Sequence, residues 1–182
     1  MENNTYHLCS LVGSTFIVAS SHSTKEWSGD LSLANGTSDY ESLENWISYE
    51  EGDLTQMEKS DNLKYYVYFS NSSKIELFAM ERGFVICDGL YFNKSWDYSR
   101  QLYFNILSEI EIEFSISGNT LYVFDSVLVG ESVINTHSNF AKFVDNCSID
   151  LNDGIYKVYR VETLVSVENQ KVLLKGVMVI QE

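Results

Sequence analysis

The most constraining feature of the sequence is a strict alternation of apolar and polar residues between positions 110 and 117. This stretch reads Ile-Glu-Ile-Glu-Phe-Ser-Ile-Ser, and the turn-forming Gly118-Asn119 follows it. A period of two is typical of a strand with one buried and one exposed face. Because a more uniformly apolar run begins at Leu121 and continues to Phe124, we predict a hairpin whose second strand is the more central one.

Similar apolar runs recur along the chain and are separated by short turns. Val, Ile and the aromatic residues, which make up 14% of the chain, favour half-buried pleated surfaces. The spacing predicts one domain over residues 1–182 with a mainly β fold and a minor helical part: an antiparallel curved sheet, a sandwich or a partly open barrel with one or two helices. Hairpins are expected from 6–12 with 15–20, from 63–69 with 74–80 and from 155–167 with 172–180, and shorter strands at 84–87 and 90–92.

Two segments show the period of a helix instead. In residues 38–47, Ser38 or Asp39 is a suitable N-cap, and an apolar stripe runs from Leu43 to Ile47; an edge strand at 46–49 is the alternative. In residues 93–107, an apolar stripe includes Leu102, Tyr103, Ile106 and Leu107. A helical turn is also expected at 138–144, whereas 21–35 and most of 130–146 are predicted to be loops.

The chain is strongly acidic, with a net charge of −14 from 26 Asp and Glu against 12 Lys and Arg. A field of this sign repels nucleic acid and anionic lipid and attracts a basic protein, although an acidic cytoplasmic protein without such a partner is the simpler alternative. The acids are densest in residues 39–61, where Lys59 is the one basic residue. We therefore predict a partner-binding segment that comprises Asp39, Glu41, Glu44, Trp46, Glu50, Glu51, Asp53, Glu58 and Asp61.

Motifs that would indicate an enzyme are missing from the sequence. There is no nucleophile elbow, phosphate-binding loop or dinucleotide-binding loop, and the spacing of His7, His22 and His137 fits no metal motif. We expect no catalysis, no cofactor and no metal. The three cysteines Cys9, Cys87 and Cys147 show no zinc or disulfide pattern and are expected to be reduced core thiols of a cytoplasmic protein. The apolar stretch from Leu8 to Ala19 lacks a positive leader and is interpreted as strands, and no run is long enough for a membrane span.

Three pieces of the sequence resemble one group of bacterial polymorphic-toxin immunity proteins, the immunity protein 21-like group. Residues 46–54, Trp-Ile-Ser-Tyr-Glu-Glu-Gly-Asp-Leu, are similar to its Trp-Ile-x-Ser-x-Gly-Gly-Pro-Leu opening, without the second Gly and the Pro. Residues 97–100, Asp-Tyr-Ser-Arg, look like its Asp-Tyr-x-Arg, and residues 118–125 resemble the strand that follows, with Phe124 in place of a Gly. The resemblance implies an intracellular protein that binds and blocks a cognate toxin domain, commonly a basic nuclease, and that has no catalytic residues.

Three functions are consistent with these observations. The first is an antitoxin-like protein that binds a basic partner through residues 39–61. The second is a small-ligand-binding, barrel-like domain of the cytoplasm, which would need an apolar cavity of about 300 Å³ or more with a few polar groups. The third is a hydrolase with two carboxylates about 5–9 Å apart in a cleft.

Overall fold

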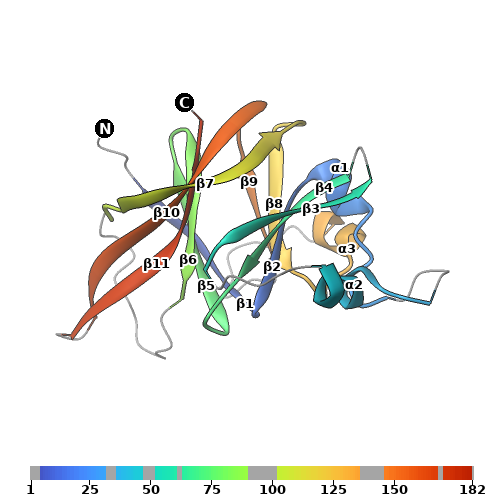
Figure 1. Cartoon of the computed structure of the whole chain (residues 1–182), viewed down its shortest axis with the longest axis horizontal. Coiled ribbons are helices and arrows are strands. Elements are labelled where there is room, and N and C mark those ends of the chain that lie inside the picture. The colour runs from blue at the N-terminus through green and yellow to red at the C-terminus, as the bar shows by residue number, and fades with distance from the viewer. Residues whose placement is uncertain are drawn as a thin grey trace.

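In the computed structural model the chain forms two antiparallel sheets that pack against each other and do not close into a barrel (Figure 1). The structure describes residues 5–31, 36–46, 52–60, 63–89, 102–135, 146–167 and 170–181. The mainly β, antiparallel architecture predicted from the sequence is confirmed. Sheet A has the order β1 (Tyr6–Val12), β5 (Lys74–Met80), β6 (Gly83–Asp88), β11 (Gln170–Ile180), β10 (Gly154–Val167) and β7 (Asn105–Ile116). Sheet B has the order β3 (Leu54–Ser60), β4 (Leu63–Phe69), β2 (Thr15–Ser20), β8 (Thr120–Asp125) and β9 (Asn146–Asp150).

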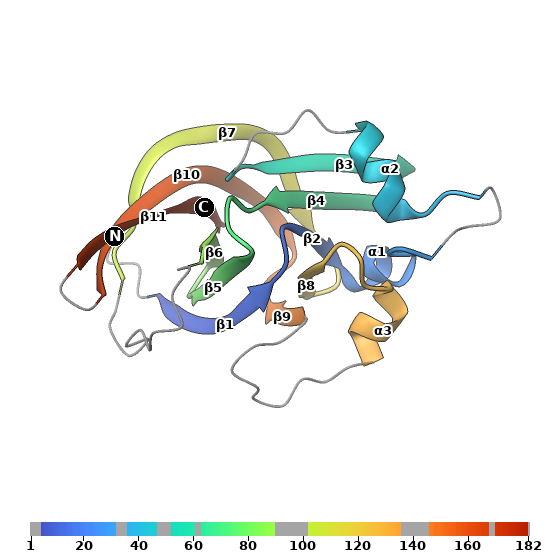
Figure 2. The ribbon, with the colours of Figure 1, turned by 90° about the horizontal axis from the view of Figure 1, so that it is seen from below.

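Three short helices lie beside sheet B, on the side away from sheet A (Figure 2). They are α1 (Ser21–Lys25), α2 (Asp39–Trp46) and α3 (Gly130–Asn135). The helix predicted at 38–47 is confirmed as α2, and Ser38 caps it, because the Ser38 hydroxyl accepts a hydrogen bond from the backbone N–H of Glu41 at 3.0 Å. Helices α1 and α3 form in segments predicted to be loops. None of the helices in the described ranges is long and apolar enough to cross a membrane.

Apolar residues fill three layers instead of one. The aromatic run of β4 shows why: Tyr66 and Tyr68 point into the core between the sheets, whereas Tyr65, Val67 and Phe69 point into a second core under the helices. A third cluster, which includes Phe78, Val165 and Met178, lies on the other face of sheet A, where Leu102 packs on it. Strands buried on both faces need apolar residues at nearly every position, which explains the continuous apolar runs in the sequence.

Several predicted hairpins are wrong, because the strands on either side of the turn belong to different sheets. The pairs β1/β2, β4/β5 and β7/β8 each begin in one sheet and end in the other. The two strands predicted to pair at 110–124 therefore belong to different sheets, and the chain crosses from one sheet to the other between them. β7 is an edge strand of sheet A, and β8 lies between β2 and β9 in sheet B. The closing hairpin at the C-terminal end is confirmed, with β10 and β11 paired from Lys157 opposite Ile180 to Val167 opposite Gln170.

The crossing turns support one another through backbone hydrogen bonds. The N–H of Gly13 donates to the carbonyl of Ser73 at 3.0 Å, and the N–H of Ser70 donates to Ser14 at 2.9 Å. A Cβ atom at Gly13 would lie 1.9 Å from Oδ2 of Asp125, so a larger residue does not fit this corner. The turns between β1 and β2 and between β4 and β5 thus form one corner of the sandwich.

Two further predictions need correction. The helix predicted at 93–107 is wrong over its described part, because β7 begins at Asn105 and residues 102–104 are not helical. Its supposed apolar stripe is divided: Leu102 is buried, whereas Ile106 and Leu107 are exposed. The polar strand β3 was not predicted, because an edge strand needs few apolar residues. The helical turn expected at 138–144 and the strand at 90–92 lie outside the described residues.

Candidate functional site

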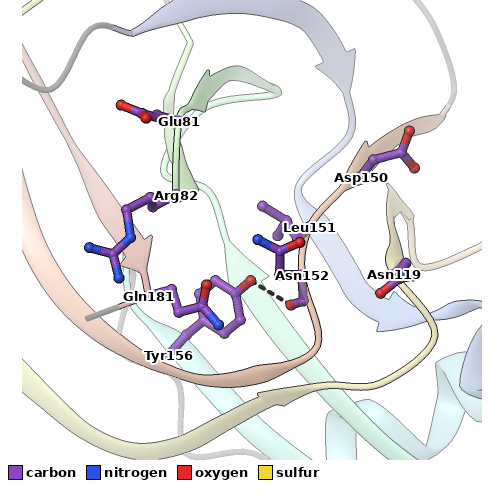
Figure 3. Close-up of a pocket in the computed structure, with 8 residues that line it drawn as sticks. All are labelled: Glu81, Arg82, Asn119, Asp150, Leu151, Asn152, Tyr156 and Gln181. Carbon is purple, nitrogen blue, oxygen red and sulfur yellow. Dashed lines mark hydrogen bonds between the residues drawn. The ribbon is translucent and has the colours of Figure 1, made fainter.

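A polar pocket of about 350 Å³ lies at one end of the sandwich (Figure 3). The turn between β5 and β6 supplies Glu81 and Arg82, the turn between β7 and β8 supplies Asn119, and the segment that links β9 to β10 supplies Leu151 and Asn152. Distant parts of the chain therefore meet at this pocket, although no sequence motif indicated it. The full lining is Glu81, Arg82, Asn119, Asp150, Leu151, Asn152, Tyr156 and Gln181.

The pocket is lined mainly by charged, carboxamide and phenol groups. The hydroxyl of Tyr156 donates to the carbonyl of Asn152 at 2.6 Å, and burial raises the pKa of this phenol, so it remains protonated at neutral pH. Figure 3 shows Glu81 and Asp150 on opposite sides of the pocket, and Asp150 accepts a hydrogen bond from Thr120 outside it. The lining residues include no cysteine, histidine, serine or lysine, and the groups among them that could act as nucleophiles are the carboxylates of Glu81 and Asp150 and the phenol of Tyr156.

The predicted acidic segment contains two carboxylates that are buried in ion pairs. Asp39 is buried; its side chain lies 2.7 Å from Nζ of Lys59 and accepts the backbone N–H of Ser28 at 2.7 Å. Asp53 is also buried and accepts two hydrogen bonds from Nε of Arg160, at 2.7 and 3.0 Å, and one from its Nη2 at 2.5 Å. These contacts give both aspartates a part in holding the fold.

The other acids of that segment are more exposed or lie outside the described residues. Glu41 accepts the N–H of Ser38 at 2.9 Å and completes the cap of α2. Glu58 has a side chain that is 52% exposed and pairs with Lys64 at 3.7 Å. Glu50, Glu51 and Asp61 lie outside the described residues, as do the side chains of Glu44 and Trp46 in α2. The structure thus leaves the predicted binding role of 39–61 as a prediction.

A buried carboxylate in β5, Glu76, is the centre of a polar cluster that the sequence analysis missed. Its Oε2 accepts the hydroxyl of Ser10 at 2.5 Å and lies 2.8 Å from Nε2 of His7, and its Oε1 lies 2.5 Å from Nζ of Lys74. Burial raises the pKa of Glu76, but these hydrogen bonds and the charge of Lys74 outweigh it, so the pKa lies below the usual value. The one available signal was an acid between Ile75 and Leu77 in an otherwise apolar strand.

This cluster contains the residue types of a hydrolase triad, but their arrangement is different. In a triad the imidazole lies between the nucleophilic hydroxyl and the carboxylate, so that it can take the proton from the hydroxyl. Here the hydroxyl of Ser10 and the ring of His7 both contact Oε2 of Glu76, so the carboxylate holds the central position. The arrangement fastens β1 to β5.

The three cysteines are reduced, and two of them meet. The thiols of Cys9 in β1 and Cys147 in β9 lie near each other, where the edge strands of the two sheets pack side by side. The neighbouring Cys147 thiol and burial raise the pKa of Cys9, whereas the neighbouring Cys9 thiol lowers the pKa of Cys147. Cys87 is fully buried in β6, and burial raises the pKa of its thiol. Among the described residues, no group of three or more His, Cys, Asp or Glu side chains is placed to hold a metal ion.

Comparisons with known proteins give no relative for this chain. No family model matches it, and neither the curated proteins nor the solved structures contain a match.

Proposed function

We propose that this protein is a non-catalytic, antitoxin-like protein of the cytoplasm that binds and neutralises a basic toxin domain. The observation that carries the proposal is the net charge of −14. Negative charge of this size steers a basic partner and raises its association rate, and it repels nucleic acid and anionic membranes.

Exposed carboxylates support the proposal. Glu58 in β3 and Glu109, Glu111 and Glu113 in β7 all have exposed side chains. They belong to neighbouring edge strands, because β3 of sheet B lies against β7 of sheet A. A basic partner that reaches this side of the molecule would meet several carboxylates at once, whereas Asp39 and Asp53 are already paired inside the fold.

The test is co-expression with the basic C-terminal domain of a large secreted protein, if the neighbouring upstream reading frame encodes one. Rescue of growth and a purified complex whose association rate falls steeply with salt are expected. Changing Glu50, Glu51 and Glu58 to lysine should slow association about tenfold or more. Asp53 is left unchanged, because its loss would disturb Arg160 and the fold.

The matched control changes Asp30, Glu81 and Glu131 to lysine. These residues are exposed and none of them belongs to the 39–61 segment, so the net charge shifts by the same amount while the acids of that segment stay unchanged. Equal slowing in both variants would assign the effect to the overall field alone. No rescue and no complex at low salt would contradict the proposed function.

The polar pocket favours a second candidate function, the binding of a small polar ligand. The volume of about 350 Å³ is large enough for a small molecule. The lining of charged and carboxamide side chains differs from the apolar cavity that a barrel-like ligand carrier would need. A thermal-shift screen with amino acids, sugars and nucleotides tests this candidate. A ligand-induced rise in Tm that Arg82→Ala abolishes would support it, and no shift with any compound would count against it.

A further inference from the structure

Among the strands that the structure describes, none pairs with the outer edge of β7 along its first half. β7 is the outermost strand of sheet A and pairs with β10 on its inner side (Figure 2). Over its second half the other edge is occupied by Tyr66 of β4, whose hydroxyl donates to the carbonyl of Glu113 and accepts the N–H of Ser115, both at 2.9 Å. Over residues 105–111, no strand in the described part of the chain pairs with this edge. Within the described ranges, this part of the edge therefore presents a row of backbone donors and acceptors that no strand pairs with.

Large apolar side chains are exposed where this edge begins. Tyr103, Ile106 and Leu107 are 60%, 56% and 53% exposed. They lie within five consecutive positions, and single exposed apolar residues are common but such a group is not. The pairing of β7 with β10 is irregular between Ile106 and Ser108, which leaves Leu107 as the extra residue of a bulge. These side chains could anchor a partner beside the open edge.

Three glutamates follow on alternate positions of the same strand. Glu109, Glu111 and Glu113 point away from the core that Ile110 and Ile112 contact. Glu109 lies 2.6 Å from Lys157 and Glu113 lies 3.5 Å from Lys64, but these ion pairs are exposed and contribute little. A strand added to this edge would need basic side chains on the face where the glutamates lie.

We propose that residues 103–113 bind an extended basic segment of a protein partner, which adds a strand to the edge of sheet A. The proposal rests on the proposed function and names the surface and the binding mode. Backbone hydrogen bonds to β7 supply the pairing, lysine or arginine at alternate positions meets the glutamate row, and apolar residues contact the group around Leu107. A second copy of this chain is disfavoured, because two β7 edges would bring glutamates against glutamates.

The probe is a synthetic peptide of alternating lysine and valine, with its binding measured by fluorescence anisotropy at low salt. Binding should protect the backbone amides of residues 105–111 from hydrogen exchange. The double variant Leu107→Lys, Glu111→Lys should weaken binding about tenfold or more, since it removes an anchor and reverses a charge. The control Ile155→Lys, Glu131→Lys makes the same chemical changes at exposed positions on other elements.

A second peptide, with alternate backbone nitrogens methylated, tests the strand pairing. It keeps the charge but cannot form the full ladder, so it should bind at least about tenfold more weakly. Equal binding of both peptides, equal weakening in the control variant, or no protection at 105–111 would overturn the proposal. Rescue of growth that survives in the Leu107→Lys, Glu111→Lys variant would overturn this surface and leave the proposed function standing. Loss of rescue in the wild-type chain would instead contradict the proposed function.

Discussion

The two sheets meet along two seams, and the two seams are built from different chemistry. Along the polar seam, where β7 lies against sheet B, Tyr66 bridges to β7, and Asp53 pairs with Arg160 of β10. Along the thiol seam, where β1 lies against β9, the thiols of Cys9 and Cys147 lie near each other. Charged groups thus hold one side of the sandwich, and two small thiols meet on the other.

The difference shows how charge in the sequence is used in the fold. Asp53 belongs to the acidic segment but is buried against Arg160 at the polar seam, whereas Glu111 lies on an open strand edge. Burying a carboxylate is costly unless it is paired, and the pairing then makes it structural. Density of acids in a sequence therefore does not identify which acids can meet a partner.

The largest effect on stability is expected from Glu76→Gln. The substitution weakens the contacts that hold β1 to β5, and β1 is the strand that contributes Cys9 to the thiol seam. The change leaves Lys74 and His7 without their carboxylate, and we expect a loss of about 4 kcal/mol in the free energy of unfolding. Urea unfolding followed by fluorescence measures it. A loss below about 1 kcal/mol would contradict a structural role for this cluster.

The same variant has a defined pH dependence. Because the pKa of Glu76 in the fold lies below its usual value of 4.5, the carboxylate stabilises the protein above that pH, and this contribution disappears as the pH falls through the lowered pKa. The difference in unfolding free energy between wild type and Glu76→Gln should therefore shrink as the pH falls below about 4.5. A difference that grows as the pH falls below about 4.5 would contradict the assignment.

Oxidation of the thiol seam should stabilise the fold. Two thiol–disulfide exchanges with a small-molecule disulfide would join Cys9 to Cys147, release two reagent thiols and transfer two electrons to the reagent. The crosslink closes a long loop, so we expect a gain of about 3 kcal/mol and a higher Tm that a reductant reverses. Mass spectrometry and thiol titration identify the bond. Cys147→Ser should abolish the gain, Cys87→Ser should retain it, and crosslinks between molecules would contradict the geometry.

A moderate effect is expected when the polar seam is cut at Asp53. Asp53→Asn removes the charge that faces Arg160, and because the Arg160 side chain is partly exposed, we expect a loss of about 2 kcal/mol. The control is Glu58→Gln, in the same acidic segment but on an exposed side chain, which should change stability by less than about 0.5 kcal/mol. Equal losses in both variants would remove the distinction between structural and surface acids.

The smallest effect is expected from Lys64→Met. Lys64 of β4 pairs with Glu58 on the neighbouring strand β3 and with Glu113 of β7 across the polar seam, but these pairs are long and exposed. We expect a Tm that does not differ measurably from the wild type at physiological salt, because such pairs are screened. A clear drop in Tm that persists at high salt would show that this bridge contributes to the seam.

Local features of the sequence were sufficient to predict much of the secondary structure. The alternation at 110–116 correctly predicted the strand β7, and the Ser38 cap correctly predicted the helix α2. The long apolar runs near the C-terminal end correctly predicted the β10/β11 hairpin. These predictions succeed because periodicity and capping depend on residues that are close in the chain. The helix predicted at 93–107 is wrong over its described part for the same reason, since a short apolar stripe fits either a helix or the start of a strand.

The candidate sites depend on contacts between distant residues. The pocket, the cluster around Glu76 and the thiol pair each join segments far apart in the sequence, and no local motif indicates them.

By itself, the sequence determined that this chain is acidic and rich in strands. Only the tertiary structure decided which strands share a sheet, because β2 and β4 carry apolar residues on both faces and fit a buried position in either sheet. It also decided that Asp39 and Asp53 are buried in ion pairs while the glutamates of β7 stay exposed. The physical reason is that burial and pairing are set by neighbours in space, whereas composition and periodicity are set by neighbours in the chain.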